Sequence, residues 1–332
     1  MARQTVPILT CFDDNYVIPA AVAFRTLVEN ADPTHHYLIY VAHSDITPEH
    51  QARLTEEVAA HGTSASLVFM DMQHRLADLF ERTGTKGHYS KEMFYKLLAP
   101  SLFPQHDKML VTDVDVVFTG DVSRDFLAFD GQGDAYLAGS PSLVKRGSWV
   151  HQVADLYVEH FTQEERSRLK VGAGYYVVNL ARMRADGLEA RLVQYAQDHA
   201  HRLRQPEQDV LNLVCHPHIA LLPADSMVCT YAYDYYRTDT DLHLDLHYSA
   251  GEVRQAMANP VQLHYAGRDK PWNSPACTRS EVWFAALGRT GFLRDHLVQL
   301  GGVLDAQRRQ KVVASMKLPF SRRQLVLSKT KI

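Results

Sequence analysis

The sequence predicts an α/β fold built on an open, mostly parallel central sheet. The main observation is that short apolar runs alternate with amphipathic helical segments from the start of the chain. The length of 332 residues, with 46% apolar and 22% charged residues, predicts a sizeable core and excludes a mainly disordered or fibrous protein. In such sheets ligands bind at the carboxyl ends of the strands, so polar residues that directly follow a strand are the first candidates for a functional site.

The first 70 residues carry the alternation most clearly. We expect strands at residues 6–12, 37–41 and 67–70, which are short and apolar. The helix between the first two strands opens with Pro19, which suits a first helical turn, and ends near Asn30. The next helix runs to about residue 60, with Thr47 as its N-cap.

The later elements continue the same pattern with less regular spacing. We expect helical segments at residues 90–98, 188–201 and 207–214, and strands at 108–112, 174–180 and 261–264. The chain contains no internal repeat, no low-complexity block and no linker rich in Pro, Gly or Ser.

The cysteine pattern and the apolar runs indicate a cytoplasmic location. The four cysteines are far apart and form no CxxC pair, which excludes a zinc ribbon and a disulfide scaffold. They are Cys11, Cys215, Cys229 and Cys277. The first residues lack the pattern of a signal peptide, and no apolar run approaches the ~20 residues that span a bilayer.

Two aspartates, Asp113 and Asp115, follow the predicted strand at 108–112. In extended backbone residues two apart project to the same side, so the two carboxylates can converge on one point. Two carboxylates repel each other unless a cation lies between them, and oxygen ligands suit Mg²⁺ or Mn²⁺, which can neutralise a phosphate leaving group. The alternative is a solvated acidic turn, although the apolar residues on both sides favour a paired or metal-bound site.

The same letters fit a second class of enzyme. Asp113-Val114-Asp115 and the two valines that follow resemble the DxDx(T/V) motif of haloacid-dehalogenase-type phosphatases, in which the first aspartate is the nucleophile. That motif normally follows the first strand of its fold, whereas several predicted strands come before Asp113 here.

Further polar clusters lie at the ends of predicted elements. The group Asp13-Asp14-Asn15-Tyr16 can bind a base and a ribose, or form an N-cap with a packed tyrosine. Lys96 lies on a predicted helix, where it can serve a diphosphate or ribose, or remain solvated. Gly172 and Gly174 allow close approach of a ligand to the backbone, and an acidic cluster at 207–209 opens a helix.

The sharpest motif is the nonapeptide HYAGRDKPW at residues 264–272. His264 ends an apolar strand and can offer a neutral imidazole to a metal, while Gly267 permits a tight turn and Lys270 can reach a phosphate. A single histidine among 18 is more often a core or surface residue, but the whole nonapeptide is harder to dismiss.

Together these motifs resemble glycosyltransferase family 8, which includes bacterial lipopolysaccharide galactosyl- and glucosyltransferases. They occur in the family's order and span residues 6–272. The matching pieces are DDNY at 13–16, YKL at 95–97, the aspartates 113 and 115, GAGYYVVNL at 172–180, EQDVLN at 207–212 and HYAGRDKPW at 264–272.

The resemblance implies a Rossmann-like GT-A fold and a retaining transfer of a hexose, Gal or Glc, from a UDP-sugar donor to a saccharide or lipid-linked saccharide acceptor. It also implies Mn²⁺ as the cofactor, with Mg²⁺ as the alternative. Carried over by position, the resemblance assigns the metal to Asp113, Asp115 and His264. It assigns the uridine to Cys11, Asp13, Asn15, Tyr16 and Val114, and the ribose and diphosphate to Lys96, Gly267 and Lys270. It assigns close backbone contacts with the nucleotide-sugar to Ala173 and Gly174, and the reacting sugar to Gln208 and Asp209.

The sequence departs from the usual family pattern without removing a predicted metal ligand. Lys96 stands where arginine is common, Gly172 where asparagine is common, and Glu207 where aspartate is common. The residues before and within the metal loop, Thr112 and Val114, also differ from the usual ones. A nucleotide-sugar-binding protein without transferase activity remains an alternative, although the intact metal set argues against it.

The net charge of −3 hides an uneven distribution. Residues 306–332 contain eight basic and no acidic side chains, so residues 1–305 hold 27 basic and 38 acidic ones. We expect a catalytic domain at 1–275 and a basic, helical extension at 276–332, whose last part, 306–332, docks on an anionic membrane surface. The charge balance gives no case for nucleic-acid binding.

Overall fold

The computed structural model describes residues 3–62, 64–73, 75–83, 90–148, 156–309, 312–317 and 324–329. The chain divides into two units, Met1–Thr290 and Gly291–Ile332. Each unit is described by itself. The first unit contains every motif that the sequence analysis singled out for the site.

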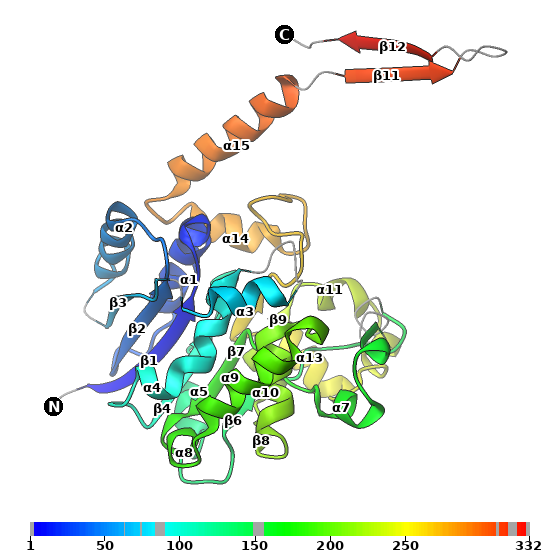
Figure 1. The fold of residues 1–332 in the computed structure, drawn as a ribbon. Coiled ribbons are helices and arrows are strands. Elements are labelled where there is room, and N and C mark those ends of the chain that lie inside the picture. The colour runs from blue at the N-terminus through cyan, green and yellow to red at the C-terminus, as the bar shows by residue number, and fades with distance from the viewer. Residues whose placement is uncertain are drawn as a thin grey trace. The chain divides into compact units, whose positions relative to one another are not determined.

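A seven-stranded sheet forms the centre of the first unit (Figure 1). Its order is β3-β2-β1-β4-β7-β6-β8, and every pairing is parallel except the two made by β7, which runs against both of its neighbours. The predicted fold class, an α/β protein with a mostly parallel central sheet, is confirmed. The strands are β1 (Gln4–Cys11), β2 (His35–His43), β3 (Ala65–Asp71), β4 (Lys108–Thr112), β6 (Leu137–Gly139), β7 (Tyr175–Asn179) and β8 (Ile219–Leu221).

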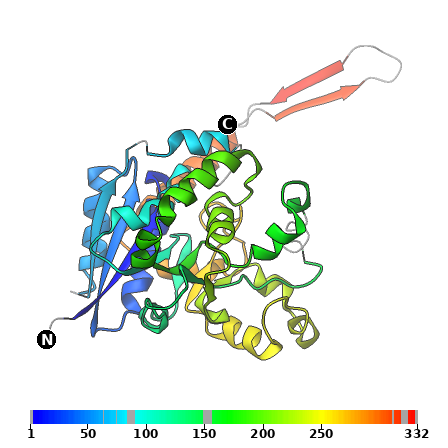
Figure 2. The ribbon, with the colours of Figure 1, turned by 60° about the horizontal axis from the view of Figure 1, so that its bottom comes forward.

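Helices lie on both sides of this sheet (Figures 1 and 2). One group packs around α1 and includes α2 and α14, and another includes α4, α8, α9 and α10. The α-helices of the first unit are α1 (Val17–Glu29), α2 (Pro48–Ala59), α3 (Ala77–Arg82), α4 (Ala99–Leu102), α5 (Ser123–Ala128), α7 (Gln163–Arg168), α8 (Leu180–Ala185), α9 (Leu188–His199), α10 (Pro206–Cys215), α11 (Ala232–Tyr235), α12 (Asp239–Leu242), α13 (Ala250–Ala258) and α14 (Ser280–Leu287).

Short 3-10 helices complete the unit, and one of them covers the helical segment predicted at 90–98. They are η1 (Asp14–Tyr16), η2 (Lys91–Leu98), η3 (Leu156–Glu159), η4 (Ala200–Arg202) and η5 (Ala224–Ser226). The helical segment expected at 90–98 is η2, in which six consecutive residues from Glu92 to Leu97 are buried. Burial on every side leaves no solvent face to impose a 3.6-residue pattern, so tertiary packing sets the local geometry.

The remaining predicted elements lie close to their expected positions. The side chain of Thr47 accepts a hydrogen bond from the backbone N–H of His50 at 3.2 Å, which is the N-cap predicted for α2. The strand predicted at 108–112 is β4, with the same bounds.

A second, smaller sheet meets the first at the Asp-x-Asp segment. Its order is β5-β10-β9, formed by β5 (Val116–Phe118), β10 (Gln262–His264) and β9 (Val228–Cys229). Asp113, Val114 and Asp115 lie between the end of β4 and the start of β5, so this short segment connects the two sheets. The apolar residues on its two sides therefore belong to different sheets rather than to one strand.

The second unit is a helix followed by two paired strands. They are α15 (Leu293–Arg309) and the antiparallel pair β11 (Val312–Lys317) and β12 (Gln324–Lys329). The second unit is helical to Arg309 and then forms two strands. Both strands contain valine, which has a high strand propensity. The proposed docking of residues 306–332 depends on side chains outside those that the structure describes, so it stays a prediction, as does the domain boundary at 275.

Among the described residues, no helix is both long and apolar enough to cross a membrane.

The central position of β1 leads to a prediction about stability. Leu9 is fully buried and pairs with Tyr40 and Val111 on the two neighbouring strands. Leu9→Ala should therefore lower the free energy of unfolding by about 2–5 kcal/mol, measured by urea denaturation. Leu221→Ala, on edge strand β8 with 59% of the side chain exposed, is the matched control and should cost less than about 0.5 kcal/mol. Equal effects of the two variants would contradict this view of the core.

Candidate functional site

Asp113, Asp115 and His264 converge at the joint between the two sheets. One ligand atom from each lies within 4.8 Å of the others. Nε2 of His264 is 3.2 Å from Oδ1 of Asp115 and 3.8 Å from Oδ2 of Asp113. His264 and Asp115 are each 9% exposed, and Asp113 is half-buried. The structure thus brings together the three residues predicted as metal ligands.

Backbone hydrogen bonds fix this convergence. The N–H of Asp113 donates to the carbonyl of Gly174 at 3.1 Å, and the N–H of Tyr265 donates to the carbonyl of Asp115 at 3.0 Å. His264 also pairs with Val116 between β10 and β5. The positions of the three side chains therefore follow from the pairing of β5 and β10 and from the turn before β7.

Each of the two carboxylates is shared between a lysine and the imidazole. Nζ of Lys96 donates to Oδ1 of Asp113 at 2.6 Å, while the other oxygen of Asp113 faces His264. Nζ of Lys270 donates to Oδ2 of Asp115, while Oδ1 faces His264. Lys270 also donates to the carbonyl of Tyr265 at 2.5 Å. Each carboxylate is therefore paired through one oxygen and presents the other to a common point.

These pairs control the charge states of the buried groups. Burial raises the pKa of Asp115, but the positive charges of Lys270 and His264 outweigh it and hold the pKa well below its usual range. Burial lowers the pKa of His264, but Asp115 outweighs it and raises the value to about 10. Burial also opposes the charge on Lys96, yet Asp113 and Glu207 raise its pKa well above the usual range. The site is thus a network of ionised groups that depend on one another.

Two glycines before β7 have different roles in this packing. A Cβ atom at Gly174 would lie 2.6 Å from Cε1 of His264 and 3.2 Å from Oδ2 of Asp113. A Cβ atom at Gly172 would meet the terminal methyl of Met227 at 2.7 Å, which is the flexible end of a side chain. Gly174 is therefore required for the close approach of His264 and Asp113, whereas the space at Gly172 can adjust.

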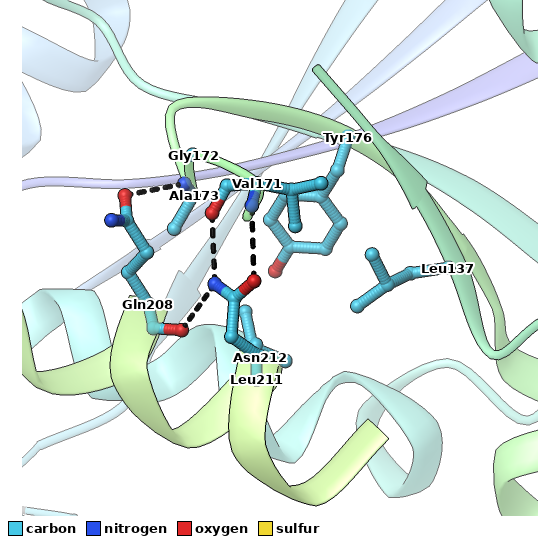
Figure 3. Close-up of a pocket in the computed structure, with 8 residues that line it drawn as sticks. All are labelled: Leu137, Val171, Gly172, Ala173, Tyr176, Gln208, Leu211 and Asn212. Carbon is cyan, nitrogen blue, oxygen red and sulfur yellow. Dashed lines mark hydrogen bonds between the residues drawn. The ribbon is translucent and has the colours of Figure 1, made fainter. Parts of the chain in front are cut away.

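Gln208 and Asn212 of α10 hold the segment before β7 (Figure 3). Oε1 of Gln208 accepts a hydrogen bond from the N–H of Ala173 at 3.0 Å. The amide of Asn212 accepts from the N–H of Val171 at 3.0 Å and donates to its carbonyl at 2.8 Å. These residues border a narrow pocket lined by Leu137, Val171, Gly172, Ala173, Tyr176, Gln208, Leu211 and Asn212.

Asp209 is fully buried at the start of α10. Its carboxylate accepts hydrogen bonds from the N–H groups of Arg204 at 2.7 Å and Gln205 at 3.0 Å, and from the hydroxyl of Tyr157 at 3.1 Å. Burial raises the pKa of Asp209 to about 7. The structure therefore places Asp209 among protein donors at the helix start, while the neighbouring Gln208 reaches the pocket.

The first polar cluster forms a compact turn after β1. Asp13 accepts hydrogen bonds from the N–H of Asn15 at 3.1 Å and from its side-chain amide at 3.3 Å, and burial raises the pKa of Asp13. Asp14 instead accepts from Nδ1 of His50 at 2.6 Å, which ties the turn to the start of α2. The ring of Tyr16 lies edge-on to Trp272, with centroids 5.7 Å apart. The two motifs at opposite ends of the matched region thus lie in contact.

The other predicted residues lie around the same centre. Burial raises the pKa of the Cys11 thiol at the end of β1, and its electrostatic neighbours include Lys96 and Asp113. Val114 is buried, so little of its side chain is open to a ligand. Gly267 has φ of +93°, a conformation that favours glycine, in the loop after β10.

Sequence reasoning missed several residues that hold the site. Gln262 is fully buried and donates from Nε2 to the hydroxyl of Thr112 at 2.7 Å. Asn273 accepts from the N–H of Lys270 at 2.9 Å and donates to the carbonyl of Arg268 at 3.1 Å, closing the loop. A polar residue inside the apolar strand at 261–264 was the available signal for Gln262.

The dense group of tyrosines at residues 231, 233, 235 and 236 can either stack on sugar rings or pack within the protein. Tyr236 is 6% exposed, belongs to a hydrophobic cluster and donates to Asp245. The hydroxyl of Tyr233 donates to the carbonyl of Met257 at 2.8 Å. For these two residues the structure supports the packed alternative.

Comparison with known proteins places the chain among the glycosyltransferases. The model of glycosyl transferase family 8 matches residues 7–276, and the chain belongs to this family. This agrees with the predicted resemblance and leaves no support for the phosphatase alternative, since Asp113 follows β4 rather than the first strand.

Relatives of known sequence are distant but cover most of the chain. General stress protein A of Bacillus subtilis is 22% identical over 275 residues, which cover 82% of this chain and 88% of that protein. The lipopolysaccharide 1,2-glucosyltransferase of Escherichia coli is 20% identical over 287 residues, which cover 85% of this chain and 77% of that protein.

Solved structures with the same fold include two glycosyltransferases. The bifunctional glycosyltransferase WbbM superposes with a TM-score of 0.66 and 21% identity, covering 90% of this chain and 52% of WbbM. This chain thus spans about half of WbbM. The galactosyltransferase LgtC superposes with a TM-score of 0.62 and 18% identity, covering 86% of this chain and 96% of LgtC. These likenesses show the GT-A fold.

The contacts of the two glycines lead to a prediction about the three-residue centre. Gly174→Ala should displace His264 and Asp113, because the added Cβ meets a ring and a carboxylate that the two sheets hold in place. Binding of Mn²⁺, followed by electron paramagnetic resonance, should weaken by about tenfold or more. Gly172→Ala is the matched control and should bind Mn²⁺ nearly as the parent protein does. If both variants bind Mn²⁺ equally well, the packing role of Gly174 is wrong.

Proposed function

We propose that the chain is a metal-dependent, retaining glycosyltransferase that transfers a hexose from a UDP-sugar to a saccharide acceptor. The observation that carries this proposal is the convergence of Asp113, Asp115 and His264 at the joint of the two sheets. Membership of glycosyl transferase family 8 supports the reaction class. LgtC, which shares the fold, was solved with donor and acceptor sugar analogues.

The donor atoms at this centre fit a divalent ion. Two carboxylate oxygens and Nε2 of His264 face one another, and the second oxygen of each carboxylate is already paired with a lysine. A bound ion would take the place of the proton on Nε2, since an imidazole binds metal in its neutral form. Oxygen-rich sets with one nitrogen suit Mn²⁺, and Mg²⁺ is the alternative because it commonly binds through one or two carboxylates and substrate phosphates. Asp113, Asp115 and His264 would hold the ion, which would stabilise negative charge on the departing diphosphate.

We infer that residues around the centre would bind the nucleotide. We assign the uridine to the turn after β1, with Asp13, Asn15 and Tyr16 and with Cys11 and Val114 beside them. Tyr16 lies against Trp272, so the turn and the loop after β10 would close on the nucleotide together. Lys270 and the backbone at Gly267 belong to that loop. The Lys270 ammonium, which pairs with Asp115, would contact the diphosphate.

The chemistry requires charge stabilisation on both sides of the breaking bond. The bond between the anomeric carbon and the diphosphate oxygen breaks, its electron pair stays on the diphosphate, and the acceptor oxygen bonds to the carbon from the same face. The acceptor proton passes to the leaving phosphate oxygen. Lys270 would stabilise the diphosphate charge more in the transition state than in the ground state.

Gln208 is the candidate for the opposite face of the sugar. Its carbonyl oxygen accepts a hydrogen bond from the N–H of Ala173 at 3.0 Å, and Ala173 directly precedes Gly174, which packs against His264 and Asp113. An amide is a poor nucleophile, so we assign Gln208 to stabilising the positive charge on the sugar. An active-site mutant of LgtC that replaces a glutamine with glutamate has been solved, which supports a glutamine within the active site. Asp209 would act by holding the start of α10.

The acceptor is assigned only by class. The Escherichia coli relative is named as a lipopolysaccharide glucosyltransferase, which supports a saccharide or lipid-linked saccharide of a surface glycan. The basic residues of 306–332 would then bring the enzyme to an anionic membrane surface from the cytoplasmic side.

The metal assignment predicts the effect of one carboxylate. Asp115→Asn should lower Mn²⁺-dependent transfer from a UDP-hexose by about 100-fold or more, because a charged ligand is replaced by a neutral one beside the reacting diphosphate. The measurement is the initial rate of sugar transfer or donor hydrolysis at saturating UDP-hexose, titrated with Mn²⁺.

The control for this variant is Asp241→Asn. Asp241 also accepts a hydrogen bond from a lysine, Lys145 Nζ at 2.5 Å, but it lies on α12 away from the three-residue centre. Its rate should stay close to that of the parent protein. Near-parental activity of Asp115→Asn would sink the metal assignment.

A further inference from the structure

The ammonium group of Lys96 is fully occupied by protein acceptors. Lys96 is 4% exposed and donates to Oδ1 of Asp113 at 2.6 Å, to the carbonyl of Ala173 at 3.1 Å and to Oε1 of Glu207 at 3.2 Å. An ammonium has three N–H donors, so each donor has a partner here. This arrangement leaves none for the ribose or diphosphate that the resemblance assigns to Lys96.

The three acceptors of Lys96 come from three parts of the candidate site. Asp113 belongs to the joint between the sheets, Ala173 to the segment before β7, and Glu207 to the start of α10. Ala173 is bonded on both sides, because its carbonyl accepts from Lys96 while its N–H donates to Gln208 at 3.0 Å. Lys96 thus connects the proposed metal centre to the proposed sugar-stabilising residue.

We propose that Lys96, with Glu207 as its second counter-ion, is a positioning residue that orients Asp113 toward the metal and holds Gln208 in place, and that it does not contact the donor. The proposal rests on the proposed function, since it requires a metal at Asp113. It adds Glu207 to the functional residues and changes the role of Lys96.

Charge and geometry both favour this role. With Oδ1 held by the ammonium, Asp113 can offer only Oδ2 to the point that it shares with Asp115 and His264. Without the ammonium, the half-buried carboxylate of Asp113 and the buried carboxylate of Glu207 would lose their shared partner and repel each other. Residues that orient metal ligands in this way commonly contribute 10–100-fold, roughly, to metal affinity.

The decisive variant is Lys96→Met, which keeps the length of the side chain and removes its charge. We expect its Mn²⁺ affinity in the absence of nucleotide, measured by electron paramagnetic resonance, to fall by about 10–100-fold. Its UDP affinity at saturating Mn²⁺, measured by calorimetry, should stay close to that of the parent protein. Unchanged Mn²⁺ affinity with weaker UDP binding would show a donor contact and overturn the proposal. Higher Mn²⁺ affinity would show that Lys96 acts only as a repelling charge, which also overturns it.

A control and a second pair of variants test the proposal even if Lys96→Met folds poorly. Lys145→Met removes a comparable ion pair, with Asp241, and should leave Mn²⁺ affinity unchanged. Lys96→Arg alone should weaken Mn²⁺ binding, because the longer side chain does not fit between the same acceptors. Adding Glu207→Asp shortens the partner and should regain about tenfold in affinity. A further loss in the double variant would contradict the pairing.

The parent protein separates this proposal from the one on which it rests. If the parent binds neither Mn²⁺ nor UDP, the metal-dependent function fails. If the parent binds both and Lys96→Met binds Mn²⁺ equally well, only the positioning role of Lys96 fails.

Discussion

The site depends on how two neighbouring carboxylates, the buried Asp115 and the half-buried Asp113, are held side by side. Asp113 and Asp115 would repel each other in a poorly solvated environment unless cations compensate for their charge. Lys96 takes one oxygen of Asp113 and Lys270 takes one oxygen of Asp115, while the remaining oxygens face His264. This division of oxygens compensates the charge of both carboxylates and leaves one oxygen of each for the proposed divalent ion.

The fold places these charges by joining two sheets at one short segment. β4 belongs to the large sheet and β5 to the small one, so the segment 113–115 is fixed at both of its ends. β10 pairs with β5 and brings His264 to the segment, and Gly174 before β7 leaves the space that the imidazole fills. The loop after β10 then returns Lys270 to Asp115 and Trp272 to Tyr16. Residues more than 250 positions apart thus form one site.

Features that depend on neighbouring residues in the sequence could be predicted. The bounds of β4, the cap at Thr47 and the position of Asp113 after a strand all follow from short-range patterns, and the structure agrees with them. The strands β6, β8 and β9 could not be predicted, because two or three residues show no periodicity. The helical segment predicted at 90–98 is present, but its 3-10 geometry could not be predicted because it depends on packing around six consecutive buried residues.

Side-chain partnerships were beyond the reach of the sequence. Lys96 and Glu207 are separated by 111 positions, and no pattern in either segment indicates that they meet. The sequence presented Lys96 as a cation free for a substrate, whereas the structure surrounds its ammonium with three acceptors. Asp209 and Gln208 are adjacent in the sequence, but their side chains have different surroundings. The carboxylate of Asp209 accepts hydrogen bonds from the backbone N–H groups of Arg204 and Gln205 inside the protein.

The central claim is that Asp113, Asp115 and His264 bind one divalent ion at the joint of the sheets. The most direct measurement is anomalous diffraction near the manganese edge from crystals of the full chain grown with Mn²⁺ and UDP. We predict a single strong peak between Oδ2 of Asp113, Oδ1 of Asp115 and Nε2 of His264, with the diphosphate on its open side. A peak elsewhere, or UDP bound with no peak among these three atoms, would contradict the account.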